Sequence, residues 1–282
     1  MFSQSLFYLS SLLSLAAAQS IQFDGRIPTG TQLTEFDVAN GIFDPSNVFG
    51  QNLTFSKLLQ LPAVQPKRSL MTIPPPSSDQ SIFAPSPTNI QTGFRRAELL
   101  PASNNGTDPS TTGVKTLHFS LMKNTARPLN LSHEYQLVFL ESSDFSTNQV
   151  VLKTGTVLGQ TVADPDTLML FSNVNNASLL FSTNFTASVF HNFGLTLDFT
   201  KNTTQVFYST GTTPLAQVTE ALPNDVSGQG QFHFGLLKKP VNGGADITTS
   251  GEQPAGIDEG IIYGGIFEED SSAGVISKSL EA

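Results

Sequence analysis

Residues 132–141 read Ser-His-Glu-Tyr-Gln-Leu-Val-Phe-Leu-Glu, and the expected fold follows from this stretch. A short, largely apolar run with aromatic residues and no helical period predicts a β-strand over Glu134–Glu141. Regular alternation would place His133, Tyr135 and Glu141 on one face of that strand. Neither face is wholly apolar, which is typical of a sheet that carries a ligand groove on its concave side.

Runs of the same kind recur along the chain, and turn sequences such as Asn242-Gly243-Gly244 separate them. We therefore predict an all-β fold, a β-jelly roll or two-sheet sandwich with an open substrate groove on the concave sheet. One short helix is expected at Phe55–Leu61, with Thr54 or Ser56 as its cap. The other predicted strands are Thr116–Met122, Gln149–Gly155, Thr167–Phe171, Leu179–Thr183, Gly194–Phe199, Gln205–Ser209, Gln231–Leu237 and Ile261–Phe267.

The composition excludes several classes of function. The 282 residues include no cysteine and no tryptophan, and the formal net charge is −9. Without cysteine there are no disulfides, thiolate metal sites or cysteine nucleophile. An acidic chain is a poor partner for a phosphate backbone, so we expect no nucleic acid. The four histidines lack ligand spacing, so we expect neither metal nor cofactor, and Glu268-Glu269-Asp270 is interpreted as a solvated acidic tail.

The chain is predicted to contain a leader, one domain and a tail. Residues 1–18 form an apolar run that ends in Ala16-Ala17-Ala18, too short to cross a bilayer. This pattern predicts a secretory signal peptide, and hence a secreted protein with no membrane segment after cleavage. We also expect a monomer. Residues 19–270 are expected to form one domain and residues 271–282 a flexible tail. Pro74–Ser78 is interpreted as a loop or exposed extended segment.

Six Asn-x-Ser/Thr sequons support export and predict a glycoprotein. If these asparagines carry glycans, they must lie on the surface. They are Asn52, Asn105, Asn130, Asn176, Asn184 and Asn202.

Few charged residues are available for chemistry. Within Phe94–Leu100, strand geometry places Arg96 and Glu98 on one face. Such a pair is either a structural ion pair or a catalytic carboxylate whose pKa the neighbour tunes. Glu134 and Glu141 lie on opposite faces of their strand, and periodicity alone leaves both as candidates for a second acidic group.

Other polar residues interrupt apolar strands. His118 is expected to be structural, whereas His233 shares a strand face with Gln231 and is a stronger candidate for a site. Gln149 and Lys153 share a face of the strand that follows Glu141.

Several short segments resemble glycoside hydrolase family 131, a group of fungal secreted β-glucanases. The similarity runs in order from about residue 21 to about residue 267. The segments are Phe23–Pro28, Gly50–Thr54, Gly93–Leu100, Gly113–Ser120, Leu131–Glu141, Asn148-Gln149 and Lys153–Gly155.

The resemblance implies a β-jelly-roll catalytic domain with an open groove that hydrolyses β-1,3-, β-1,4- and β-1,6-linked glucans. The family's catalytic carboxylates would fall on Glu98 and on a glutamate of the His133-Glu134-Tyr135 strand, with Glu141 favoured and Glu134 in reserve. The resemblance also implies inversion of configuration and marks His233 as a groove residue.

The two glutamates fit acid–base chemistry. Arg96 would keep Glu98 ionised, which suits a base, and the apolar neighbours Phe139, Tyr135 and Leu137 would favour a protonated acid at Glu141. Without tryptophan, sugar stacking falls to phenylalanine or tyrosine, with Tyr135 preferred. The predicted substrate-binding residues are Arg96, His133, Tyr135, Gln149, Lys153 and His233.

Two other functions compete with hydrolysis. An Arg-x-Glu strand beside His, Gln and Lys also resembles jelly-roll polysaccharide lyases that act on uronans, although the net charge of −9 fits a neutral glucan better. A non-catalytic glucan-binding wall protein is the second alternative.

Overall fold

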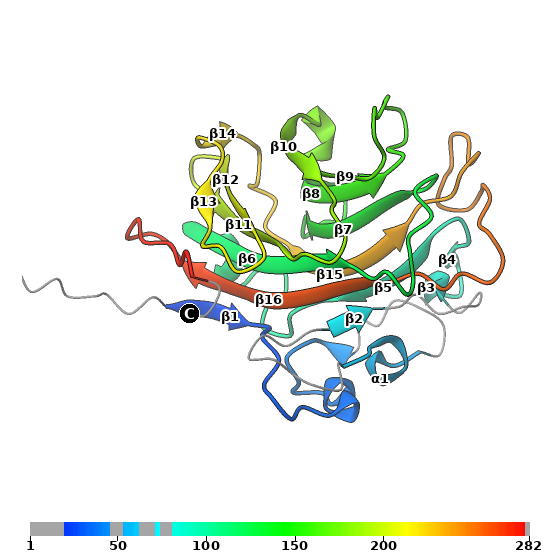
Figure 1. Cartoon of the computed structure of the whole chain (residues 1–282), viewed down its shortest axis with the longest axis horizontal. Coiled ribbons are helices and arrows are strands. Elements are labelled where there is room, and N and C mark those ends of the chain that lie inside the picture. Colours follow the sequence, from blue (N-terminus) through cyan, green and yellow to red (C-terminus); the bar gives the residue numbers. More distant parts are fainter. Residues whose placement is uncertain (1–19, 46–52, 62–70, 74–80, 280–282) are drawn as a thin grey trace, which may run out of the picture.

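Two antiparallel sheets pack face to face in the structure, a computed structural model that describes residues 20–45, 53–61, 71–73 and 81–279 (Figure 1). The prediction of an all-β, jelly-roll-like sandwich is confirmed. The predicted signal peptide at 1–18, the sequon at Asn52 and the Pro74–Ser78 segment lie outside the described residues.

One sheet has six strands in the order β10-β9-β8-β7-β15-β5. It holds the strand from which the fold was predicted, β7, between β8 and β15. The strands are β5 (Arg95–Leu99), β7 (Glu134–Glu141), β8 (Asn148–Gly155), β9 (Thr167–Phe171), β10 (Leu179–Asn184) and β15 (Gln231–Lys238).

The second sheet has eight strands, with the path β1-β16-β6-β11-β12-β13, β2 pairing with β16 and β14 with β12. A separate hairpin joins β3 (Phe83–Ser86) and β4 (Asn89–Gln91). The strands of the second sheet are β1 (Ile21–Asp24), β2 (Met71–Ile73), β6 (Val114–Lys123), β11 (His191–Asp198), β12 (Thr203–Thr210), β13 (Ala216–Gln217), β14 (Leu222–Pro223) and β16 (Ile261–Asp270).

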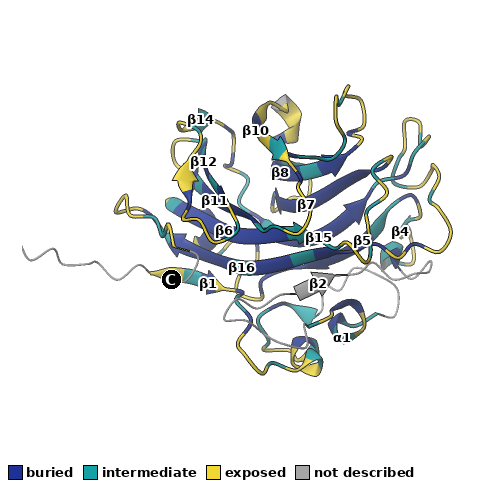
Figure 2. Ribbon diagram, viewed as in Figure 1, coloured by how far each residue is buried: buried dark blue, intermediate teal, exposed yellow. Residues whose placement is uncertain are grey.

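Phenylalanine fills the space between the sheets, and the central strands are buried along most of their length (Figure 2). Phe119 of β6 stacks on Phe193 of β11 with ring centroids 5.1 Å apart, and meets Phe234 of β15 edge-on at 6.2 Å. The contact between Phe119 and Phe234 joins the two sheets, so aromatic packing supplies cohesion that disulfides provide in many other domains.

The N-terminal segment closes the sandwich beside β5. Phe43 forms an isolated bridge with Pro101, and the Asp44 amide donates to the Leu100 carbonyl. The helix predicted at Phe55–Leu61 is shorter than expected, because α1 spans Phe55–Leu58, and Thr54 occupies the N-cap position without a side-chain cap bond. Short 3-10 helices lie at Leu33–Asp37, Pro109–Thr111 and Val174–Asn176.

A β-bulge in β7 interrupts the regular alternation that was predicted for this strand. The register with β8 shifts between Gln136 and Val138, so Leu137 is an extra residue on β7. Leu137 and Val138 therefore both pack into the main core. The extra residue moves Tyr135 to the face opposite Glu141, so the prediction that they share a face is wrong.

The expectation of a solvated acidic tail at the end of the chain is also wrong. Glu268 and Glu269 lie in β16 and are fully buried, so they are not part of a solvated acidic tail. Ser277 donates to Glu269, and the Lys278 carbonyl accepts from the Leu215 amide. The predicted tail at 271–282 is thus bound to the sheet as far as Lys278.

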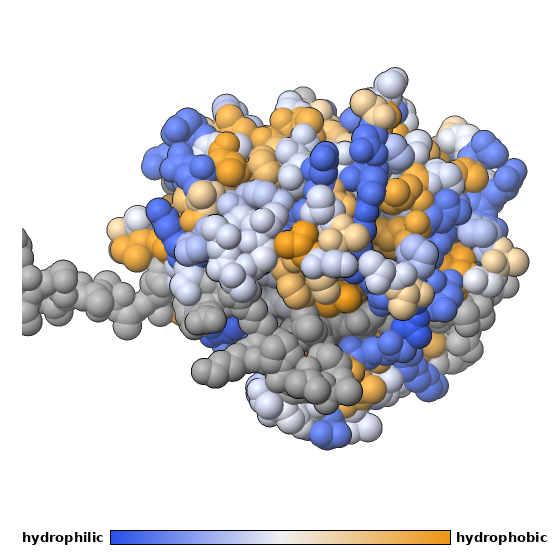
Figure 3. All heavy atoms as spheres, in the orientation of Figure 1, coloured by the Kyte–Doolittle hydropathy of each residue, from blue (hydrophilic) through white to orange (hydrophobic). Residues whose placement is uncertain are grey.

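The surface mixes polar and apolar side chains, as the face in Figure 3 shows. Asn105, Asn130 and Asn184 are exposed and Asn202 is partly exposed, so these four sequons are accessible. Within the described ranges, we find no helix with the length and apolar character needed to cross a bilayer.

Candidate active site

The sheet face turned away from the main core, here called the outer face, carries the predicted Arg96–Glu98 pair. Ala97 and Leu99 of β5 point into the core, so the alternate residues Arg96 and Glu98 point outward as predicted. Arg96 binds Glu98 through two hydrogen bonds, Nε to Oε1 at 2.7 Å and Nη2 to Oε2 at 2.9 Å. Phe83 packs on the other side, with its ring centroid 4.6 Å from the Arg96 guanidinium carbon.

Glu98 is an ionised carboxylate in a buried site, with a side-chain exposure of 0%. Burial by itself would raise the pKa of Glu98. The charge of Arg96 and hydrogen bonds from His233 and Arg96 outweigh burial and lower this pKa to about 2. The carboxylate therefore stays ionised down to pH values near 2.

His233 of β15 links Glu98 to Glu141 of β7. Its Nδ1 lies 2.7 Å from Glu98 Oε2, and its Nε2 lies 3.4 Å from Glu141 Oε2. The imidazole stacks on Phe139 with centroids 4.3 Å apart. Burial would lower the pKa of His233, but the carboxylates of Glu141 and Glu98 raise it above the usual value. Three neighbouring strands thus build one chain of charges, Arg96–Glu98–His233–Glu141.

Glu141 is the member of this chain that faces solvent, with 25% of its side chain exposed. A pocket of about 90 Å³ opens beside it, lined also by Asn105, Gln231 and Phe145. The backbone at residue 230 packs closely against Glu141, which only glycine allows. The φ of Gly230 is +109°, and an added Cβ would lie 1.7 Å from the Glu141 carbonyl oxygen. A ligand that enters this pocket meets a carboxylate backed by a buried ion network.

The reserve candidate Glu134 lies at the other end of β7, in a different ion cluster. Lys153 Nζ lies 2.9 Å and Lys239 Nζ 2.7 Å from Glu134 Oε1, and the Leu158 amide donates to Oε2. Burial would raise the pKa of Glu134, but the two lysines lower it. The geometry therefore connects Glu141, and not Glu134, with Glu98.

Four predicted substrate-binding residues do not join the site. Tyr135 is fully buried in the main core and donates to Glu259 at 2.6 Å, so it offers no ring to a sugar. His133 is buried, with Nδ1 2.8 Å from the Lys239 carbonyl, and Lys153 pairs with Glu134. Gln149 is buried and binds the Gly228 amide and Gln229 carbonyl, at the edge of a separate polar pocket. The structure thus brings Arg96 and His233 together with Glu98 and places the other four residues away from this pair.

His118 is structural, as predicted. Its Nε2 lies 3.0 Å from Glu269, and its ring stacks on Phe267 with centroids 4.4 Å apart. In the described part of the chain, no group of three or more His, Asp or Glu side chains is arranged to hold a metal ion.

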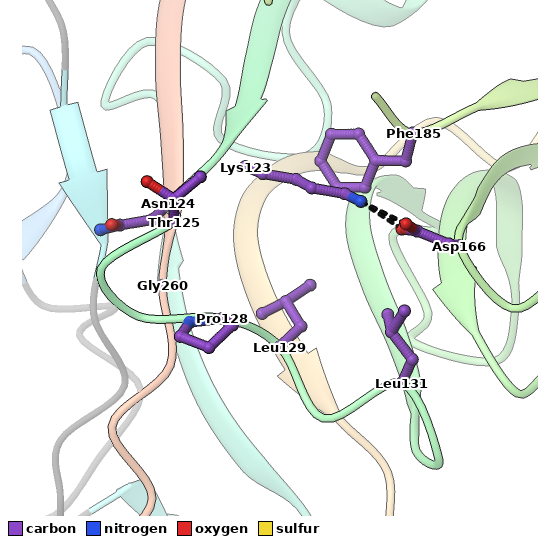
Figure 4. A pocket seen from close by; sticks show the side chains of 9 residues that line it. All are labelled: Lys123, Asn124, Thr125, Pro128, Leu129, Leu131, Asp166, Phe185 and Gly260. Carbon is purple, nitrogen blue, oxygen red and sulfur yellow. Dashed lines mark hydrogen bonds and ion pairs between the residues drawn. The ribbon is translucent and has the colours of Figure 1, made fainter. Parts of the chain in front are cut away.

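A second pocket, of about 250 Å³, is separate from the charge chain (Figure 4). Leu129, Leu131 and Phe185 give it a mainly apolar lining, and Lys123 forms an ion pair with Asp166 at its edge. Its single carboxylate is already neutralised by a lysine, so this pocket lacks the two acidic groups that glycosidic cleavage requires.

Two residues that shape the site, Phe145 and Tyr263, were not predicted from the sequence. Phe145 lines the Glu141 pocket, and a lone phenylalanine within the polar turn Ser142–Thr147 was a readable signal. Tyr263 of β16 donates its hydroxyl hydrogen at the bulge, with Leu137 and Gly235 carbonyls 2.7 and 2.8 Å away. No local pattern marks Tyr263, because its partners lie on the other sheet.

The family model of the glycoside hydrolase 131 catalytic N-terminal domain matches residues 21–274. No curated protein sequence matches the chain significantly. Among solved structures, the catalytic domain of a GH131 β-glucanase from Podospora anserina is similar with a TM-score of 0.71 and 21% identity, covering 93% of this chain and 100% of that one. A GH131 catalytic domain from Coprinopsis cinerea has a TM-score of 0.67 and 22% identity, covering 92% and 97%. Since the family model spans nearly all the described residues, the chain belongs to glycoside hydrolase family 131 through its catalytic domain.

Proposed function

We propose that the protein hydrolyses β-1,3-, β-1,4- and β-1,6-linked glucans at the pocket beside Glu141. The observation that carries this proposal is the continuous contact from buried Glu98 through His233 to partly exposed Glu141. Two carboxylates on neighbouring parts of one sheet supply the pair of groups that glycosidic cleavage needs. The β-glucanase named among the similar structures supports a glucan as substrate.

Glu141 is the proton donor in this proposal, because its side chain reaches solvent where a glycosidic oxygen can bind. Glu98 is the ionised carboxylate that takes the proton of the attacking water. The two carboxylates contact different nitrogens of the imidazole, at 2.7 and 3.4 Å, so both contacts and the ring separate them. This arrangement supports inversion, since retaining enzymes bring the two carboxyl groups to ~5–5.5 Å. Product anomers followed by NMR during hydrolysis test this point.

Arg96 and His233 enclose Glu98, so water reaches it only when substrate binding shifts one of them. Rescue of Glu98→Ala by azide or formate tests the direct role, because a small anion replaces a base. If rescue fails while Glu141→Gln is inactive, Glu98 is a positioning residue that acts through His233.

The decisive experiment measures reducing-sugar release from laminarin and cello-oligosaccharides by wild type, Glu141→Gln and Glu98→Gln. Both variants should lose more than ~99% of activity, since acid–base groups contribute 10²–10⁴-fold. Glu220→Gln, at an exposed residue between β13 and β14, is the matched control. Glucan binding without sugar release by the wild type would establish the wall-protein alternative, and unsaturated ends from uronans would establish a lyase.

The proposal includes export and glycosylation. The N-terminal leader pattern and the accessible sequons at Asn105, Asn130, Asn184 and Asn202 support it. Expression with the natural leader should place the protein in the medium, with a mass that falls after glycan removal.

A further inference from the structure

Phe145 is the only exposed aromatic ring in the described part of the chain, with 73% of the residue accessible. Every other phenylalanine there is buried or partly buried. A large apolar ring left in water suggests a contact surface when it stands beside a functional pocket. Phe145 does so, because it lines the same pocket as Glu141.

The turn that carries Phe145 is tightly bonded. Asp144 Oδ1 accepts hydrogen bonds from the Ser142 hydroxyl at 2.7 Å and from the Ser146 amide at 3.0 Å. The Phe145 amide donates to the Ser142 carbonyl at 2.8 Å, and the Ser143 amide to the Gly228 carbonyl at 3.0 Å. These contacts fix the backbone of the turn from which the Phe145 ring projects.

Phe145 also has a backbone conformation that phenylalanine disfavours. Its φ is +59°, in the left-handed region where asparagine and glycine are the usual residues. Neither the exposure of the Phe145 ring nor its left-handed backbone stabilises the fold. Both become understandable if the ring binds a ligand.

A polar pocket of about 370 Å³ lies on the other side of the same turn. It shares Ser142 and Ser143 with the Glu141 pocket. Hydroxyl, amide and carboxylate groups line it, the pattern that hydrogen-bonds sugar hydroxyls. The residues include Asp144, Ser146, Asn175, Asp225, Ser227 and Gln229.

We propose that Phe145 is a sugar-stacking platform next to the cleavage position, and that the glucan runs from the Glu141 pocket across this ring toward the polar pocket. This inference rests on the proposed function. A β-linked glucose has axial C–H bonds on both ring faces and hydroxyls at its edge. Its face therefore fits the Phe145 ring, while its edge reaches the polar groups of the turn.

The test replaces Phe145 by asparagine, which tolerates the left-handed backbone and removes the ring. Phe145→Asn should raise KM for laminari-oligosaccharides about five- to tenfold, the effect of losing one aromatic contact. Its kcat should stay within about twofold and its Tm should not fall. Phe145→Tyr keeps a ring and should have the KM of the wild type. Leu179→Ala, at an exposed apolar residue of β10, should also leave KM unchanged.

Bacterial expression removes any glycan at Asn105, which lines the same pocket. An unchanged KM in Phe145→Asn, with active wild type, overturns the platform and leaves the proposed function standing. If the wild type hydrolyses no β-glucan, the proposed function fails, and calorimetric binding of laminarin then decides the platform. Weaker binding by Phe145→Asn than by wild type supports it; equal binding, or no binding by either protein, overturns it.

Discussion

Nδ1 of His233 lies 2.7 Å from Oε2 of Glu98, and both side chains are closed off from solvent. The contact couples the two groups. It lowers the pKa of Glu98 and, together with Glu141, raises the pKa of His233. Each of these two buried groups therefore favours the charged form of the other, and removing either one leaves the other without compensation.

Glu98 should make the fold sensitive to acid. Its pKa is about 2 in the folded protein and 4.5 in the unfolded chain. The stabilisation is complete above pH 4.5 and is lost as pH falls toward 2, on the order of 3 kcal/mol in the free energy of unfolding. Urea unfolding between pH 2 and 7 should show this slope in wild type and not in Glu98→Gln. The same dependence of the free energy of unfolding on pH in both proteins would contradict the lowered pKa of Glu98.

His233 should give the opposite pH dependence. Its folded pKa is raised above 6.5, so its stabilisation is complete below pH 6.5 and is lost as pH rises through the folded pKa. His233→Gln should remove this loss of stability and lower kcat at least ~100-fold, because Glu98 and Glu141 lose their link. Urea unfolding from pH 5 to 9 and laminarin hydrolysis measure the two effects. Laminarin hydrolysis at the wild-type rate by His233→Gln would show that catalysis does not need His233.

Glu134→Gln should distinguish the two glutamates of β7. The change leaves Lys153 and Lys239 without their shared carboxylate, so the free energy of unfolding should fall by about 3 kcal/mol. Activity measured well below Tm should stay within about threefold of wild type, because this cluster is apart from Glu98. Loss of activity in Glu134→Gln with normal activity in Glu141→Gln would reverse the assignment of the second carboxylate.

Tyr263→Phe should weaken the bulge that orients β7. The carbonyls of Leu137 and Gly235 share the single hydroxyl hydrogen of Tyr263, and the phenylalanine variant leaves this buried donor position empty. We expect a loss of about 1–3 kcal/mol in the free energy of unfolding. A lower kcat should accompany it, because the bulge determines which face Glu141 occupies. Chemical unfolding and laminarin kinetics on the same preparation measure both, and unchanged values would show that the bulge holds without Tyr263.

Local patterns predict the site only where strands are regular. Arg96 and Glu98 are two residues apart on an uninterrupted strand, so alternation placed them together correctly. Tyr135 was misplaced because one inserted residue, Leu137, reverses the alternation, and nothing in the local sequence marks the bulge. The role of Gln149 depends on the 228–229 loop, some 80 positions away in the chain, a tertiary contact that composition and period do not encode.

Glu268 offers a route to a more stable protein. It is fully buried, and neither carboxyl oxygen has a hydrogen-bond partner among the described residues. Burial raises the pKa of Glu268 well above its usual value, and Lys115 only partly opposes this. The folded state therefore holds a proton that the unfolded chain releases above pH 4.5, so stability falls as pH rises from 4.5 until the folded pKa is reached.

Replacing Glu268 by the neutral Gln or Met should remove that loss. At pH 7 we expect the free energy of unfolding to rise by at least ~1 kcal/mol and Tm by about 2–4 °C, while at pH 4 the variants should resemble wild type. Glu220→Gln, at an exposed position, is the matched control and should change Tm at neither pH. Scanning calorimetry at both pH values checks the prediction. A Tm for Glu268→Met below that of wild type at pH 7 would mean that the buried carboxyl group contributes more to packing than its desolvation costs.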